Sequence, residues 1–368
     1  MLTQIKLNNF ECFKDIELNL SHLNIFSGLN GTGKSSVIQA ILLLQQSYAK
    51  GYLPYKVCLN GDYTHLGTGR DILYENAEKD FDENNEIIKI ETSSGELKQS
   101  YIIKYESDSD VLDVIQQKKI NSVEPFIFRK EFEYLNAERA SPQTIYPKSS
   151  YHVDTRHQLG INGQYAVHYL SKFQDSLIPW NSCCSNEKNL KGAVQYWLSE
   201  ISPNIRIDIQ DITYTDLSKI GYYYFSNIIK SNIVRPTNNG FGISYVLPVI
   251  ISLLKAEAES ILIIENPEAH LHPKGQRKIG ELIARCAASG VQIFIETHSD
   301  HILNGIRIAV KNNQIKSKDT SVLFFQKKFN KDGIEHTFLK PIIKNNGKFD
   351  FWPDDFFDEW DKALDQII

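Results

Sequence analysis

A glycine-rich segment close to the N-terminus constrains the fold of this chain more than any other feature. Residues 23–36 read LNIFSGLNGTGKSS: an apolar strand pattern, a glycine-rich loop and the start of a helical run that continues to Leu44. Glycine allows the backbone to curl so that successive N–H groups point at one anion, and the helix N-terminus adds a positive dipole end. The segment therefore predicts a phosphate-binding P-loop.

The P-loop pattern gives each polar group a role. Lys34 is expected to reach the β- and γ-phosphates of a nucleotide, and the Ser35 hydroxyl to ligate Mg²⁺. A chance glycine turn is the alternative, but a strand before the loop and a helix after it form the context that the motif requires. The residues expected to bind ATP are Asn30, Gly31, Thr32, Gly33, Lys34, Ser35 and Ser36.

Composition narrows the class of protein. The chain has 368 residues and a formal net charge of −5, which argues against a protein that coats nucleic acid nonspecifically. The longest apolar runs are too short to span a bilayer and no signal segment is present, so a cytoplasmic location is expected. The cysteines indicate neither a disulfide framework nor a CxxC metal site; they are Cys12, Cys58, Cys183, Cys184 and Cys286.

Antiparallel strands are predicted around the P-loop. Residues 5–10 and 15–20 alternate apolar and polar side chains, and residues 86–91 and 101–105 flank a polar turn, which favours a hairpin. A P-loop among antiparallel strands is typical of ABC-type ATPases, whereas the core sheet of GTPases is mostly parallel. We expect residues 1–125 to form an N-terminal ATPase lobe.

The middle of the chain, residues 126–233, predicts an inserted subdomain of mixed but mainly helical structure. A strand is expected at 131–137 and helices at 164–173 and 190–201, with a polar loop at 181–186. No heptad run is sustained, so long coiled-coil arms are not expected.

Three further motifs lie in residues 234–368, which we expect to form a C-terminal ATPase lobe. Gly242 and Ser244 open a helix and make a second anion site. An apolar strand ends in Glu265, where P-loop proteins hold Mg²⁺, and a helix is expected over 273–288. A further strand, 291–296, is followed by His298.

In this order, the motifs resemble the Walker A, signature, Walker B and switch-histidine motifs of ABC ATPases. Residues 265–273 (ENPEAHLHP) and 296–299 (ETHS) look like those of the OLD-type branch, the stand-alone "AAA family ATPases" of bacterial antiphage defence clusters. Residues 134–139, 240–244 and 351–359 also look like that group. The resemblance implies an α/β ABC ATPase head, in which a mixed sheet with a P-loop core joins an antiparallel β lobe and the inserted subdomain.

The resemblance also implies roles for single residues. Glu265 would ligate Mg²⁺ together with Ser35, and His298 would sense the γ-phosphate. Gly242 and Ser244 would cap the γ-phosphate of the opposite subunit in an ATP-dependent homodimer.

Some positions depart from the ABC pattern. ABC ATPases usually carry Asp and then Glu at the Walker B strand end, but here the pair is Glu265-Asn266, and an amide cannot act as a base. Hydrolysis is therefore expected to be slow, or Glu268 takes over the role of the base. Tyr245 stands where the signature usually has Gln. Gln45 and Gln46 lie on the first helix, where we expect them to pack or face solvent and not to act as a Q-loop glutamine.

Two other interpretations concern metals and the tail. His270, His272, His298 and His301 could form a zinc cluster, but tetrahedral sites usually include Cys or carboxylate ligands. Basic residues dominate 307–348, which is either a solvated face or a docking surface. The acidic tail after Asp350 could suggest a nuclease centre, but its interleaved aromatic residues favour a terminal helix that packs on the body.

Three functions remain compatible with the sequence. The first is an ATPase switch subunit that controls a separate effector, a nuclease or toxin, in an antiviral complex, with only indirect nucleic-acid contact and no membrane contact. The second is a RecF-like DNA-repair ATPase, which the segment after Glu265 fits poorly. The third is a complete OLD-type nuclease. Such enzymes carry a Toprim nuclease domain after the ATPase, and we expect the residues that follow Glu265 to be mostly taken up by the ATPase fold itself.

Overall fold

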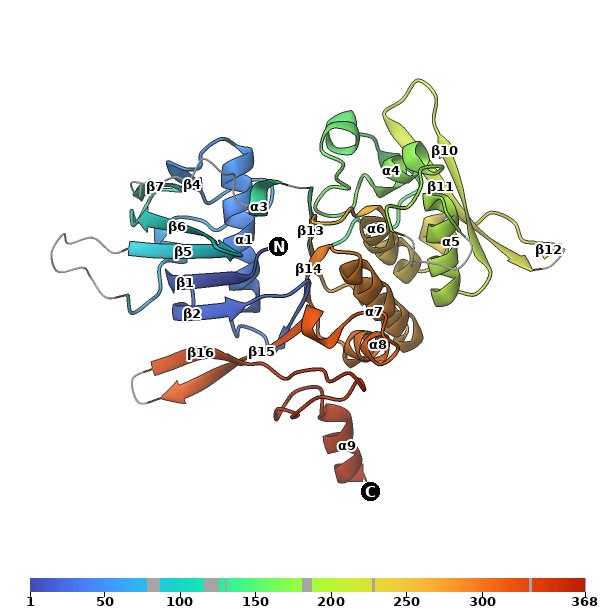
Figure 1. Cartoon of the computed structure of the whole chain (residues 1–368). Helices are drawn as coiled ribbons and strands as arrows, with labels where there is room; N and C mark the ends of the chain where they lie inside the picture. Colours follow the sequence, from blue (N-terminus) through green and yellow to red (C-terminus); the bar gives the residue numbers. More distant parts are fainter. Residues whose placement is uncertain are drawn as a thin grey trace. The chain divides into compact units, whose positions relative to one another are not determined.

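The computed structural model describes residues 1–77, 87–115, 126–129, 131–180, 187–226, 229–330 and 333–367 (Figure 1). The chain divides into two compact units. Unit 1 comprises Met1–Lys130 and Ser321–Pro341, and unit 2 comprises Glu131–Thr320 and Ile342–Ile368. Cys183, Cys184 and the loop predicted at 181–186 lie outside the described residues. The three-domain division at 125 and 233 stays a prediction.

Unit 1 contains the predicted antiparallel lobe, a six-stranded sheet in the order β2-β1-β5-β6-β7-β4. The two strand pairs expected from alternation are confirmed, because β1 pairs with β2 and β5 pairs with β6, both antiparallel. Apolar side chains that alternate along these strands form the buried face. The strands are β1 (Gln4–Phe10), β2 (Phe13–Asn19), β4 (Lys56–Cys58), β5 (Ile87–Ser94), β6 (Leu97–Lys104) and β7 (Val111–Ile115).

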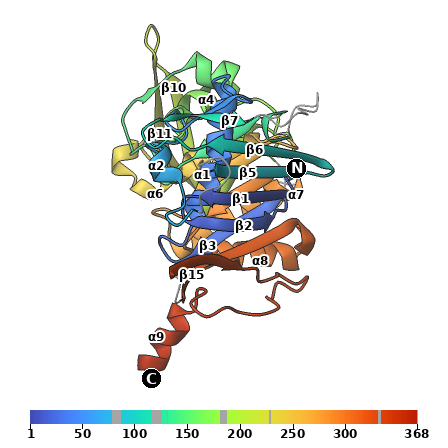
Figure 2. The same cartoon turned by 90° about the vertical axis from the view of Figure 1, so that its left-hand side faces the viewer.

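The P-loop lies between β3 (Leu23–Gly28) and α1 (Lys34–Ala49), as predicted. Helix α1 lies beside the antiparallel sheet (Figure 2). Most of its residues are buried, which is consistent with its lack of a polar face. Gln46 donates to the carbonyl of Cys58 and Gln45 to that of Ile127, so both glutamines are structural. A hairpin of β15 and β16 places β15 beside β3. The remaining elements are α2 (Gly69–Ile72), α3 (Phe126–Arg129), β15 (Thr320–Asn330) and β16 (Gly333–Leu339).

Unit 2 contains three parallel strands in the order β14-β13-β8. Their apolar residues are almost all buried, as expected for strands covered on both faces. Because the strands are parallel, the loops after their C-terminal ends share one edge. The elements are β8 (Phe132–Leu135), β13 (Ile261–Glu265), β14 (Gln292–Glu296), α6 (Phe241–Lys255), α7 (Pro273–Ala288) and α8 (Asp300–Lys311).

The middle section of unit 2 combines helices with a small sheet. The predicted helices are confirmed as α4 (Ala166–Phe173) and α5 (Leu190–Ile201), which pack on β10 and β11 (Figure 1). A section of mixed structure was expected, but the strands of this small sheet were not predicted. Its strands are β9 (Tyr146–Pro147), β10 (Ile205–Asp211), β11 (Leu217–Ser226) and β12 (Ile229–Lys230), and the short helical turns are 151–155, 236–238 and 317–319.

The acidic tail forms the predicted terminal helix, α9 (Glu359–Ile367), but the helix is not what anchors it. Phe349, Trp352 and Phe356 form an aromatic cluster under the Arg307 guanidinium, and Phe356 is fully buried. The described side chains of α9 itself are mostly exposed. The aromatic residues before the helix therefore pack on the body, in place of the helix.

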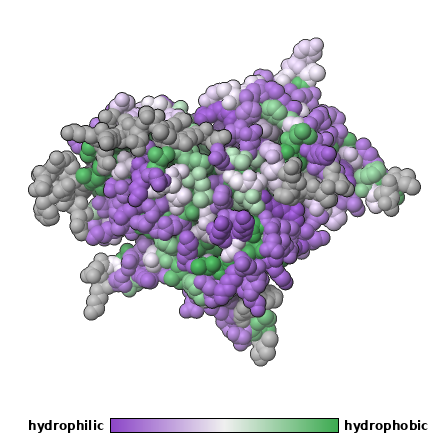
Figure 3. All heavy atoms as spheres, in the orientation of Figure 1, coloured by the Kyte–Doolittle hydropathy of each residue, from purple (hydrophilic) through white to green (hydrophobic). Residues whose placement is uncertain are grey.

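The surface is mainly hydrophilic on the face shown in Figure 3, where apolar residues form only small patches. Within the described ranges, we find no helix with the length and apolar character needed to cross a bilayer.

Candidate functional site

The P-loop of unit 1 has the curled backbone that its sequence predicts. Gly28, Gly31 and Gly33 all have positive φ angles, of 135°, 71° and 104°, which side chains other than glycine rarely adopt. The alternation of left-handed glycines with other residues turns successive N–H groups in one direction. The loop is therefore built as an anion cradle that leads into the N-terminus of α1.

Lys34 lies across this loop. Its side chain is 3 % exposed, and Nζ donates to the carbonyl oxygens of Gly28 at 3.0 Å and Leu29 at 2.9 Å. The Thr32 hydroxyl donates to the same Leu29 carbonyl at 2.8 Å. Ser35 is exposed in the first turn of α1. The lysine is thus held inside the loop, and the magnesium-ligand candidate faces outward.

A pocket of about 440 Å³ opens beside the P-loop within unit 1. Two of its lining residues contact the loop region: Cys12 Sγ lies 3.5 Å from Ser36 Oγ, and His336 Nδ1 lies 3.1 Å from the Thr32 carbonyl oxygen. Burial raises the pKa of Cys12 to about 11, so the thiol is protonated at neutral pH. Tyr74 and Asp15 line the same pocket. Sequence reasoning gave no role to any of these residues.

In unit 2, Glu265 lies at the end of β13 and is held by a side chain of β8 and by the loop that follows β8. Its Oε1 accepts from the Tyr134 hydroxyl at 3.0 Å, and its Oε2 accepts from the Ala137 N–H at 3.1 Å. Burial raises the pKa of the Glu265 carboxyl, and the neighbouring Glu296 raises it further, although both hydrogen bonds oppose the shift. The carboxylate predicted to ligate Mg²⁺ is therefore oriented by two donors.

Arg139 supports the same strand end. It is 3 % exposed, and its Nη2 donates to the main-chain carbonyl of Glu265 at 2.7 Å. Its Nε and Nη1 are also buried and donate to no residue that the structure describes. Burial lowers the pKa of the guanidinium to about 10, and the charges of Glu265 and Glu268 oppose that shift. A buried cation with unused donors thus lies among the carboxylates.

Glu268 is linked to the predicted switch histidine through the backbone. Its Oε1 accepts from the His298 N–H at 2.9 Å, while its buried Oε2 accepts no hydrogen bond within the described ranges. Asn266, in the usual place of the base, adopts a left-handed φ of 44°, and its N–H donates to the Glu296 carbonyl at 2.8 Å. The structure thus brings together Glu265, Glu268 and the backbone of His298 in unit 2.

The two predicted signature residues differ in their surroundings. A Cβ at Gly242 would lie 2.6 Å from the His270 carbonyl oxygen, so the close packing of α6 on the turn after β13 requires glycine. Tyr245 packs edge-on against the His270 ring. Ser244 is buried, and its hydroxyl forms no hydrogen bond with any residue that the structure describes. Their action on an opposite subunit stays a prediction.

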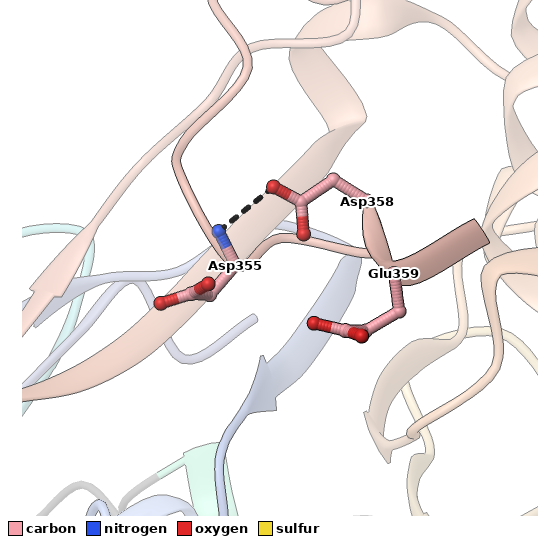
Figure 4. Close-up of side chains that lie close together, drawn as sticks. All are labelled: Asp355, Asp358 and Glu359. Atoms are coloured by element: carbon pink, nitrogen blue, oxygen red, sulfur yellow. Dashed lines mark hydrogen bonds between the residues drawn. The ribbon is translucent and has the colours of Figure 1, made fainter. Parts of the chain in front are cut away.

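The remaining candidate metal groups are weak. In the described part of the chain, no three of the four histidines considered for zinc bring their ring nitrogens within metal-binding distance of one another. The one group there with such spacing consists of Asp355, Asp358 and Glu359 (Figure 4). Asp358 Oδ2 there accepts from the Asp355 N–H at 3.1 Å, and Lys362 forms ion pairs with all three carboxylates. One lysine thus pairs with this cluster and offsets one of its three negative charges.

A comparison with protein-family models assigns the P-loop region to an ATPase family. The model of the AAA ATPase domain family matches residues 1–158 and 170–303, and a protein family of unknown function, DUF3696, matches residues 315–367. None of the curated proteins compared matches the chain.

Solved structures of SMC head domains are similar to this chain at low identity. One is an SMC head bound to the C-terminal winged-helix domain of ScpA, with 12 % identity, 92 % and 98 % coverage of this chain and that chain, and a TM-score of 0.46. Another, from Pyrococcus furiosus, has 10 % identity, 100 % and 99 % coverage, and a TM-score of 0.46. The SMC head of Thermotoga maritima has 10 % identity, 92 % and 98 % coverage, and a TM-score of 0.40. Because its family model matches most of the chain, this protein belongs to the AAA ATPase domain family.

Proposed function

We propose that this protein is an ATP-dependent switch that binds ATP through its P-loop and hydrolyses it slowly. The observation that carries the proposal is the curled loop with three positive-φ glycines, within which Lys34 is held by carbonyl groups. An entering phosphate offers Lys34 a charged partner in place of those carbonyls, and charge-assisted hydrogen bonds are the stronger kind.

The pocket beside the loop suits the rest of the nucleotide. Two residues that line the pocket contact the P-loop region: Cys12 contacts Ser36, and His336 contacts Thr32. The pocket is therefore next to the phosphate cradle. Tyr74 and Asp15 supply an aromatic ring and a hydrogen-bond acceptor. We assign this pocket to the base and ribose.

Mg²⁺ fits the oxygen donors that the sequence supplies. The exposed Ser35 hydroxyl and the Glu265 carboxylate are both ligand types that this ion prefers, and the ion would neutralise phosphate charge when bound. Tyr134 and Ala137 orient the carboxylate before any ion binds. Glu268 is the proposed base, because its buried Oε2 is unused within the described ranges and Asn266 cannot accept a proton. His298 is the proposed γ-phosphate sensor.

Calorimetric titration with ATP and Mg²⁺ tests the binding site. Lys34→Ala should abolish binding, whereas Lys98→Ala, which removes an exposed lysine of β6, should bind as the wild type does. Thermal unfolding of each variant controls for loss of the fold. Wild-type ATP affinity in a folded Lys34→Ala variant would show that the loop is assigned wrongly.

We further propose that ATP brings two copies together through the start of α6. Ser244 is buried, so Ser244→Arg would disturb the interior of unit 2 as well as any interface. Phe241, the first residue of α6, is 57 % exposed and is the better probe. Phe241→Glu should prevent dimerisation with a non-hydrolysable ATP analogue in sedimentation experiments while leaving the monomer folded. Dimerisation equal to that of the wild type would contradict the proposal.

The partner of the switch is proposed to be a separately encoded nuclease or toxin of an antiviral defence system. The support is the resemblance of residues 265–273 and 296–299 to OLD-type ATPases. Tagged protein expressed from its own operon should co-purify such an effector in a nucleotide-dependent manner. Purification of the protein alone under every nucleotide condition would argue against an effector complex.

A further inference from the structure

The hairpin of β15 and β16 contacts the P-loop with two basic side chains. Lys327 on β15 and His336 on β16 are directly opposite each other in the antiparallel register. His336 Nδ1 lies 3.1 Å from the Thr32 carbonyl oxygen, and a Cβ placed on Gly31 would lie 3.3 Å from Lys327 Nζ. One face of the hairpin therefore lies against the glycine-rich loop.

The Lys327 ammonium is available for a ligand. The residue is exposed, and it forms no ion pair or hydrogen bond with any residue that the structure describes. Lys34, in contrast, is buried and already donates to two carbonyls. The loop thus has one cation inside and a second cation at its outer edge.

We propose that Lys327 is a second phosphate-binding cation of the nucleotide site, supplied by the C-terminal hairpin. This inference rests on the proposed function and goes beyond it, because Lys327 lies in the segment that matches the family of unknown function. The cross-strand contact of His336 with Thr32 fixes the hairpin on the loop, so the ammonium stays within reach of the phosphate chain. Residues 315–367, which match the family of unknown function, would then contribute to the ATP site.

ATP titration of three variants tests the inference. Lys327→Met keeps the aliphatic stem and removes the charge, which should raise the Kd for ATP about tenfold, as expected for one lost charge-assisted hydrogen bond. Lys327→Arg should bind within about threefold of the wild type, because it keeps the charge. Lys328→Met is the matched control, since the next residue of a strand points to the other face and is equally exposed. It should not change the Kd.

Two results would overturn the inference while leaving the proposed function intact. One is a Lys327→Met protein with wild-type affinity, and the other is equal weakening by Lys327→Met and Lys328→Met, which would indicate a general charge effect. A wild-type protein that binds no ATP would instead refute the proposed function and this inference with it.

Discussion

Unit 2 contains two groups of carboxylates that differ in burial and in counter-charge. Glu265 and Glu268 follow a buried strand and lie near the buried Arg139, whose Nε and Nη1 remain unused within the described ranges. Asp355, Asp358 and Glu359 lie close together at the start of α9 (Figure 4). All three pair with Lys362. The counter-charge of the first group is buried, since Arg139 is 3 % exposed, whereas the Lys362 side chain of the second group is 41 % exposed. Each group keeps one buried acceptor that is unused within the described ranges, Glu268 Oε2 in the first and Asp358 Oδ1 in the second.

The difference shows why acidic residues alone do not define a site. Exposed ion pairs contribute little because water and salt screen them. A buried group with an unused donor or acceptor is costly to keep, and binding of a ligand is one reason to retain it. Both groups contain such an acceptor, so the burial of the counter-charge is what separates the candidate catalytic group from the tail.

The largest expected effect comes from Glu265. Glu265→Gln should lower the ATP hydrolysis rate on the order of 10³-fold, because the neutral amide lacks the charge that we propose as a ligand of Mg²⁺. Asp358→Asn, the matched change in the tail group, should leave the rate unchanged. Steady-state phosphate release by both variants measures the comparison. Equal losses in the two variants would mean that burial does not distinguish the groups.

Glu268 should have the next largest effect. Glu268→Gln should lower the hydrolysis rate about 10²-fold, the smaller end of the range for a positioned base, without weakening ATP binding. Glu359→Gln in the tail is the control. Full activity of Glu268→Gln would leave the chain without a base among the carboxylates that we assign.

The sequence predicted the elements whose information is local. The P-loop, β13 with Glu265, and α7 each occupy one contiguous run of residues, and the structure has them at the predicted positions. The β10–β11 sheet was missed, although Ile205, Ile207 and Ile209 alternate with polar residues. Such a short alternation is weaker evidence for a strand than the longer periodic run over 190–201 is for a helix.

The contacts around the sites could not be predicted, because they join distant parts of the chain. Arg139 precedes Glu265 by 126 residues, and His336 follows Thr32 by 304. Residues 134–139 look like the OLD-type group, but no local pattern predicts that Arg139 contacts Glu265 or that His336 contacts Thr32. The parallel pairing of β8 with β13 explains the first contact, and the return of β15 to the side of β3 explains the second.

Arg139 tests the buried group through stability. Arg139→Lys keeps the charge but loses the planar donor to the Glu265 carbonyl, which should lower the free energy of unfolding by about 2 kcal/mol, typical of a hydrogen bond from a charged group. Lys362→Met in the tail should leave the urea midpoint unchanged. Urea denaturation followed by circular dichroism measures both variants, and the comparison fails if the two midpoints shift equally.

The smallest expected effect is the pH dependence of the tail group. Partial desolvation acts to raise the pKa of Asp358, but the hydrogen bonds from Lys362 and from the Asp355 N–H outweigh it and lower the pKa below its usual range. A carboxyl whose pKa is lowered in the folded state contributes stability above its unfolded pKa, about 3.9, and loses that contribution as pH falls through the folded value. Any difference in thermal midpoint between wild type and Lys362→Met should therefore be small at pH 7 and vanish in acid. A difference that instead grows as pH falls would show that Lys362 stabilises the tail by some route other than its carboxylate partners.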